Sequence, residues 1–199
     1  ALIAQKVCEN QKTAMGAIIG LSDEYIEKRI REIHDNSGEP IYFANYNGPG
    51  QVVITGSKKG VRLACKAFKK EGAKRAVPLP IAGSFHSPYM LEAEKELGEI
   101  IKKIKFNEPD IPIYQCVDGR CHTDIDEIKN NLIQHITHPV LWTKMVNSMV
   151  VEGVNEFYEV GTDQTLQKIT KRMCPDMLVT SLWTENFYEK IAKESYKLI

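Results

Sequence analysis

The sequence predicts a mixed α/β protein built from two parts. Short apolar segments that suit buried strands alternate with longer segments whose apolar residues recur at helical spacing. In the first part the elements follow the order strand, helix, strand, strand, helix, strand. In the second part strands and helices alternate, which is typical of a parallel sheet covered by helices.

The first part begins with an apolar segment from Thr13 to Leu21, which predicts a buried strand. Ser22 is placed to cap a helix, and the two acids after it favour the positive end of that helix. The remaining elements are a strand at 41–45, a turn at 47–50, a strand at 51–55, a helix capped by Ser57 and ending at Gly72, and a strand at 73–80. This order is that of a ferredoxin-like unit, and we expect a small subdomain at 13–82.

The remaining residues are assigned to a larger domain. Residues 1–12 resemble the end of a helix, and since the chain does not start with Met we expect a preceding segment. The pattern after residue 83 predicts helices at 88–103, 124–136, 141–151 and 165–172, strands at 113–117, 154–160 and 177–182, and a charged tail helix. Open α/β sheets usually contain more strands, so we expect an incomplete parallel sheet in 83–199.

Composition excludes several classes of function. The 26 Lys and Arg residues balance the 26 Asp and Glu residues, which disfavours nucleic acid and anionic membranes as partners. No apolar run is long enough to cross a bilayer. The five cysteines contain no Cys-x-x-Cys pair, which argues against a disulfide framework and a structural zinc site. We expect a cytoplasmic protein, with an organelle matrix as the alternative.

A candidate catalytic loop runs from Leu79 to Met90. Small residues, a proline and a glycine interrupt an apolar strand there, and Phe85 and His86 stand just before the next helical pattern. Catalytic side chains concentrate in loops that are held at both ends by regular elements. A histidine beside a phenylalanine also fits a structural role, so this loop alone does not decide the function.

Six motifs, taken in order, carry a resemblance to a known family. They are Asn45-Tyr46-Asn47-Gly48-Pro49-Gly50-Gln51-Val52-Val53-Ile54, Gly72-Ala73-Lys74-Arg75-Ala76, Leu79-Pro80, Phe85-His86-Ser87, Pro139-Val140-x-Trp142 and Glu159-Val160-Gly161. Together they resemble the malonyl-CoA:acyl carrier protein transacylases of fatty-acid and polyketide synthesis, over residues 13–172. The resemblance implies an α/β-hydrolase-like domain with an inserted ferredoxin-like subdomain, of which this chain would be the C-terminal portion.

The resemblance also implies a reaction and roles for five residues. Malonyl would pass from CoA to the phosphopantetheine thiol of acyl carrier protein through an acyl-serine. His86 matches the general base, and His135 matches the position whose backbone carbonyl orients that base. Phe85 matches the residue that crowds an α-methyl branch, and Asn45 and Gln51 would lie near the acyl and pantetheine path. The expected partners are malonyl-CoA, as substrate, and acyl carrier protein, with no cofactor and no metal.

Two further features leave alternatives open. No Gly-x-Ser-x-Gly occurs in the 199 residues, so we expect the chain alone to be inactive. It would be a fragment, one of two complementary chains, a non-catalytic carrier-protein or CoA-binding module, or a free-standing regulatory domain.

Lys74 and Arg75 would form a docking face for an acidic carrier or an ordinary solvated surface. A metal pair of His135 and His138 is disfavoured because no carboxylate or thiol supports it at helical spacing.

Overall fold

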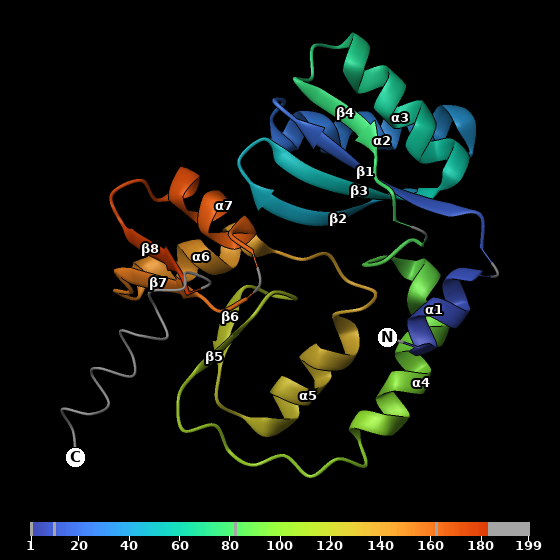
Figure 1. Cartoon of the computed structure of the whole chain (residues 1–199). Helices are drawn as coiled ribbons and strands as arrows, with labels where there is room; N and C mark the ends of the chain where they lie inside the picture. The colour runs from blue at the N-terminus through green and yellow to red at the C-terminus, as the bar shows by residue number, and fades with distance from the viewer. Residues whose placement is uncertain (1, 10, 82, 162, 183–199) are drawn as a thin grey trace. The chain divides into compact units, whose positions relative to one another are not determined.

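The computed structural model describes residues 2–9, 11–81, 83–161 and 163–182 (Figure 1). The predicted tail helix lies outside these residues. The chain divides into two units, Ala1–Ser148 and Met149–Ile199, which are described separately. The predicted boundaries, a small subdomain at 13–82 followed by part of a larger domain at 83–199, stay predictions.

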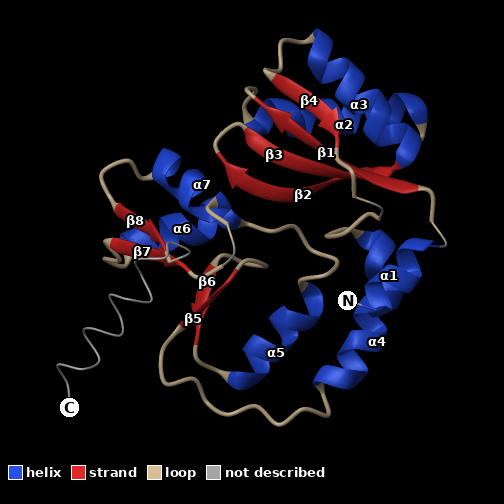
Figure 2. Ribbon diagram, viewed as in Figure 1, coloured by secondary structure: helices blue, strands red, loops and turns tan. Residues whose placement is uncertain are grey.

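The first unit contains a four-stranded antiparallel sheet with the order β2-β3-β1-β4. In chain order its elements are β1 (Thr13–Ile19), α2 (Asp23–Ser37), β2 (Ile41–Gly48), β3 (Gln51–Ser57), α3 (Lys58–Lys70) and β4 (Arg75–Pro78). Both helices cover the same face of the sheet (Figure 2). The strand order and the two crossovers are those of the predicted ferredoxin-like unit.

The core of this unit lies between the sheet and the two helices. Its buried residues come from one stripe of each helix and from the facing side of the strands: Ile18, Ile26, Ile30, Ile33, Ile41, Val52, Ile54, Val61, Ala64, Cys65, Phe68 and Ala76. The helix boundaries follow local capping. Ser22 Oγ accepts a hydrogen bond from Tyr25 N (3.3 Å), and Ser57 Oγ accepts one from Gly60 N (2.9 Å), which confirms both predicted N-caps.

The rest of the first unit is mostly helical. Its elements are α1 (Leu2–Glu9), the 3₁₀ turn η1 (Pro88–Met90), α4 (Leu91–Ile101), β5 (Ile113–Gln115), β6 (Arg120–His122), α5 (Ile125–Gln134) and the start of α6 (Trp142–Val151). α1 and α4 share a small core with Met90. β5 pairs antiparallel with β6, a strand that the sequence pattern did not predict.

The second unit contains β7 (Glu156–Glu159), α7 (Thr165–Met173) and β8 (Leu178–Ser181). β7 and β8 pair in parallel with α7 between them in sequence, as the pattern predicted. The Glu159 carboxylate accepts hydrogen bonds from the backbone N–H groups of Leu166 (3.0 Å) and Gln167 (2.8 Å), at the positive end of α7. Within the described residues, no helix combines the length and the apolarity needed to traverse a bilayer.

Candidate active site

Buried hydroxyl groups anchor the loop that carries His86 to the sheet. Ser84 Oγ lies 2.7 Å from Thr55 Oγ1 on β3 and 3.0 Å from Ser87 Oγ. Ser87 Oγ in turn donates to the Ser84 carbonyl (2.6 Å). All three side chains are at most 1% exposed. An unpaired buried hydroxyl would be costly, and here each has a partner, so the loop is held in one position on β3.

The backbone of this loop is strained. His86 has φ +59°, the one positive φ outside glycine among the described residues. A side chain in the left-handed region is uncommon, and such residues cluster at functional sites. Three residues earlier, Gly83 has φ +129°, and a Cβ there would lie 2.3 Å from Cys8 Sγ. The His86 N–H donates to the carbonyl of Ile136 (3.0 Å), so a distant segment helps to hold the strained conformation.

The imidazole of His86 is oriented by two main-chain oxygens. Its Nδ1 lies 2.8 Å from the carbonyl of His135 and 3.2 Å from that of His138. Carbonyl oxygens only accept hydrogen bonds, so Nδ1 must carry the hydrogen. In the neutral ring Nε2 then holds the free lone pair, which is the arrangement that a general base requires.

The turn that supplies these carbonyls directly follows α5 and is itself tied down. The Thr137 hydroxyl donates to the carboxylate of Glu94 on α4. His138 Nδ1 lies 2.9 Å from both the Gln134 carbonyl and Thr137 Oγ1. The sequence did not predict the roles of Thr137, Glu94 and the His138 carbonyl. Contacts that hold a main-chain turn do not require particular residue types, so they leave no recognisable pattern in the sequence.

The side chain of His135 has a different environment from its carbonyl. Burial lowers its pKa, and the nearby ring of His86, whose centroid is 5.1 Å away, lowers that pKa further. Desolvation of an imidazole favours its neutral form. A neutral His135 means that no second cation opposes the positive charge that His86 gains when it accepts a proton.

The segment after His138 is attached to the edge of β2. Val140 N donates to the Ala44 carbonyl (2.8 Å), Tyr46 N donates to the Val140 carbonyl (2.9 Å), and Asn45 forms a parallel bridge with Val140. Thr143 Oγ1 adds a hydrogen bond to the Tyr46 carbonyl (3.0 Å). The Pro139-Val140-x-Trp142 motif and the hairpin motif are therefore in direct contact, although they are far apart in the sequence.

A groove of about 400 Å³ opens beside the histidine. It is lined by Glu27, Ile30, Arg31, Ile41, Tyr42, Phe43, Tyr46, His86, Pro88, Thr137 and Pro139. The Tyr46 hydroxyl donates to Glu27 Oε1 (3.0 Å), and burial together with this carboxylate raises the pKa of Tyr46. The groove therefore offers both apolar walls and fixed polar groups, as small-molecule sites commonly do.

The other predicted site residues are not among those that line this groove. Phe85 packs against the small core shared by α1 and α4. Asn45 stands at a register irregularity of β2, and Gln51 begins β3, paired with Gly48 across the hairpin. The structure therefore brings His86 and His135 into direct contact, while the substrate roles of Phe85, Asn45 and Gln51 stay predictions. Within the described ranges, no group of three or more His, Cys, Asp or Glu residues could hold a metal ion.

Comparison with known proteins identifies the family of this arrangement. No family model matches the chain. The malonyl CoA-acyl carrier protein transacylase of Escherichia coli K12 is 41% identical over 169 residues, which cover 85% of the chain and 54% of the relative. The chain belongs to this family. It spans about half the length of the curated transacylases it matches, in agreement with the predicted partial coverage.

Solved structures support the same assignment and confirm the predicted fold class. An acyl carrier protein S-malonyltransferase from Vibrio cholerae superposes with a TM-score of 0.89 and 35% identity, over 96% of the chain and 61% of that structure. A malonyl-transacylase solved in complex with a type II polyketide acyl carrier protein gives a TM-score of 0.83 and 32% identity, over 90% of the chain and 57% of that protein. The transacylase fold thus accounts for nearly all of the chain.

Proposed function

We propose that this chain is the base-bearing portion of an enzyme that transfers malonyl from CoA to the phosphopantetheine thiol of acyl carrier protein. The observation that carries the proposal is the fixing of His86 Nδ1 by two main-chain carbonyls, which leaves Nε2 free. The names of the related proteins supply the malonyl group and the carrier. We place the enzyme in the cytoplasm and assign it no cofactor.

The proposed reaction has two half-reactions. In the first, His86 Nε2 takes the proton of a serine hydroxyl while the serine oxygen attacks the thioester carbonyl of malonyl-CoA. The C–S bond breaks, and the proton passes to the departing CoA thiolate. In the second, Nε2 takes the proton of the phosphopantetheine thiol, whose sulfur attacks the acyl-serine, and the proton returns to the serine oxygen. The two steps share one base and regenerate the enzyme.

The serine is the part of this mechanism that the chain does not carry. No Gly-x-Ser-x-Gly occurs in its 199 residues, so we assign the nucleophile to the portion of the transacylases that the chain does not match. Phe85 is proposed to disfavour a branched acyl group. Lys74 and Arg75, both exposed, are proposed to contact the acidic carrier.

The test is a two-stage labelling experiment with the complete enzyme. With malonyl-CoA alone, we expect the malonyl label to become covalently bound to the protein while free CoA is released. Addition of the carrier that bears phosphopantetheine should then move the label to the carrier. Carrier binding without covalent labelling would contradict the enzyme and favour the non-catalytic binding module instead.

A further inference from the structure

A single turn, residues 135–138, supplies three hydrogen-bond acceptors to His86. The His86 N–H donates to the Ile136 carbonyl (3.0 Å), and Nδ1 lies 2.8 Å from the His135 carbonyl and 3.2 Å from that of His138. The φ of +59° at His86 is unfavourable, so this conformation depends on the contacts around it. A rotation of the turn would therefore displace the imidazole.

The turn is joined to its surroundings at both ends and in the middle. At the start, Ile136 packs against the small core of α1 and α4, and beyond the end Val140 pairs with the edge of β2. Between them, Thr137 is buried and His138 is exposed. The Thr137 hydroxyl connects this middle part to α4 through the carboxylate of Glu94.

The Gln134 carbonyl, just before the turn, is crowded by hydrogen-bond donors. The backbone nitrogens of Thr137 and His138 each lie 3.0 Å from its oxygen, Thr137 Oγ1 lies 3.0 Å away and His138 Nδ1 2.9 Å away. A carbonyl oxygen has two lone pairs, so it cannot bond well to four donors. The Glu94 carboxylate is the stronger acceptor for the Thr137 hydrogen because it is charged. Glu94 thus removes one competitor at this carbonyl.

The same hydrogen sets the direction of the bond between Thr137 and His138. His138 Nδ1 faces the Gln134 carbonyl, which only accepts, so Nδ1 carries a hydrogen. Toward Thr137 Oγ1, 2.9 Å away, Nδ1 can then only donate. The hydroxyl oxygen accepts this bond while its own hydrogen points to Glu94. This arrangement holds His138 where its carbonyl reaches His86 Nδ1.

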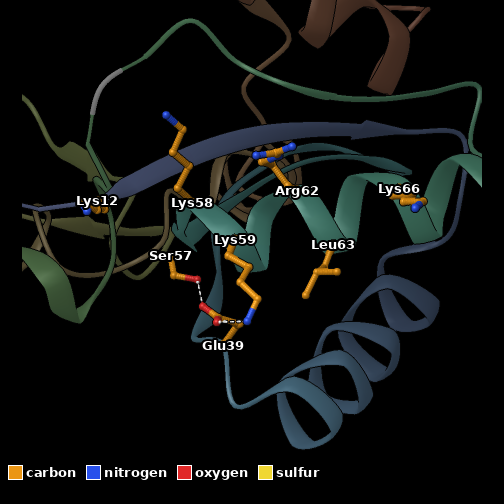
Figure 3. A pocket seen from close by; sticks show the side chains of 8 residues that line it. All are labelled: Lys12, Glu39, Ser57, Lys58, Lys59, Arg62, Leu63 and Lys66. Carbon is orange, nitrogen blue, oxygen red and sulfur yellow. Dashed lines mark hydrogen bonds and ion pairs between the residues drawn. The ribbon is translucent and has the colours of Figure 1, made fainter.

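A second hydroxyl of the chain is arranged in the same way. At the start of α3, Ser57 Oγ donates to Glu39 Oε2 (2.6 Å) and accepts from Gly60 N (2.9 Å). Figure 3 shows the bond between Ser57 and Glu39. There the carboxylate takes the hydroxyl hydrogen, and a lone pair of the same oxygen caps the helix. The corresponding pair at Thr137 holds a turn instead of a helix end.

Helix stability alone does not account for Glu94. Glu92 and Glu94 both stand in the first turn of α4, where acids favour the positive end of the helix. Glu92 is exposed, whereas Glu94 is partly buried. One turn further along α4, a Cβ on Gly98 would lie 3.5 Å from Ile133 Cγ2 on α5. This close approach of the two helices brings Glu94, but not Glu92, to the turn that follows α5.

We propose that Glu94 is a positioning residue for His86, acting through Thr137 and the turn 135–138. With the Thr137 hydroxyl held by Glu94, the carbonyls of the turn keep the His86 ring in one rotation and its hydrogen on Nδ1. The inference rests on the proposed function, in which Nε2 of this ring accepts a proton. Glu94 itself exchanges no proton with the substrate.

The kinetic test compares two variants of Glu94 in the complete enzyme. Glu94→Ala frees the Thr137 hydroxyl, and kcat for malonyl transfer should fall about tenfold with little change in KM, because the base is misplaced while substrate binding is retained. Glu94→Gln keeps an oxygen that accepts the same hydrogen and should restore most of kcat. Equal losses in the two variants, or an unchanged kcat in Glu94→Ala, would overturn the proposal.

Glu92→Ala is the matched control, since it removes the same charge from the same turn of α4. It should lower the melting temperature slightly through the helix dipole and leave kcat unchanged. A tenfold loss of kcat in Glu92→Ala would assign the effect to α4 as a whole and refute a specific role of Glu94.

A double variant tests the link through Thr137. Thr137→Val replaces the hydroxyl by a methyl group and should lower kcat at least as much as Glu94→Ala. The double variant should lose no more than Thr137→Val alone, because both changes break the same bond. Losses that multiply in the double variant would mean two independent effects and would contradict the proposed link.

An NMR measurement of the His86 ring separates this inference from the proposed function. At a pH where the ring is neutral, the two ring nitrogens of the wild type should show the hydrogen on Nδ1. Glu94→Ala should shift the ring toward a mixture of the two tautomers, and Glu94→Gln should not. An unchanged ring in Glu94→Ala would refute the positioning role even where His86→Ala abolishes transfer. Transfer at the full rate by His86→Ala would instead refute the proposed function, and the effect of Glu94 on the ring would stand.

Discussion

Two histidines of the first unit are both held by hydrogen bonds, but in opposite ways. His86 uses only Nδ1, which faces the carbonyls of His135 and His138. His122 uses both ring nitrogens, since Nδ1 lies 2.9 Å from Glu127 Oε2 and Nε2 lies 2.8 Å from Asp118 Oδ2. The His86 ring is oriented through one nitrogen and keeps the other without a hydrogen-bond partner among the described residues, whereas both nitrogens of the His122 ring are bonded.

The difference shows which histidine can act as a base. Neutral carbonyls orient His86 without requiring it to be charged, so it can gain and lose a proton during a reaction. Two carboxylates favour the charged form of His122, which cannot accept another proton. Restraint of a side chain is therefore not enough to indicate catalysis; an unused acceptor atom is also needed.

Replacement of His86 should have the largest effect. In the complete enzyme, His86→Ala removes the proton acceptor, and we expect malonyl transfer to fall by about two to four orders of magnitude. His122→Gln serves as the matched control and should change the rate little. Rates are measured as malonyl transfer to the carrier. A comparable loss in both variants would remove the distinction between the two histidines.

The support of the His86 loop predicts a loss of stability. Ser84→Ala leaves the buried hydroxyls of Thr55 and Ser87 without their shared partner, which should lower the free energy of unfolding by about 1–3 kcal/mol. Ser148→Ala is the control, because its hydroxyl bonds to a carbonyl on the same helix and is exposed. Urea unfolding measures both. Equal effects would mean that the buried network does not hold the loop.

Replacement of Phe85 tests whether the loop that carries His86 also selects the acyl group. Phe85→Ser opens space beside His86, and methylmalonyl use should rise relative to malonyl by about tenfold, the effect of one methyl group in a well-packed pocket. Because Phe85 also packs against a small core, its removal will cost stability. Phe85→Leu keeps most of the bulk and should leave the acyl preference nearly unchanged. An unchanged ratio in the serine variant would place the ring away from the acyl group.

The sequence predicted the elements that have local signals. Ser22 and Ser57 were identified as N-caps because capping depends on one residue type at one position. Gly38, which ends α2, has φ +67°. This left-handed conformation is typical of a glycine just after a helix, so it too depends on one residue type at one position. β6 was missed, since its Arg-Cys-His sequence has neither apolar alternation nor β-branched residues.

The site was predicted only in part, because its contacts join distant segments. His86 and His135 were named through the family resemblance, but the bond between Thr137 and Glu94 links residues 43 positions apart and depends on how α4 meets the end of α5. The hydroxyl network of Thr55, Ser84 and Ser87 also joins segments that are distant in the sequence. Serine and threonine are common, and nothing in their types shows that these three are buried together.

The smallest effect concerns pH and His122. Its side chain is 10% exposed. Burial alone would lower its pKa, but hydrogen bonds to Glu127 and Asp118 overcome this and raise the pKa above its ordinary value. A raised pKa in the folded state means that the stabilisation is fully present at pH values below the unfolded pKa of about 6.5 and is lost as the pH rises through the folded pKa. The melting temperature of the wild type should therefore fall over this range relative to that of His122→Gln, and parallel curves would show that the two carboxylates do not hold a charged ring.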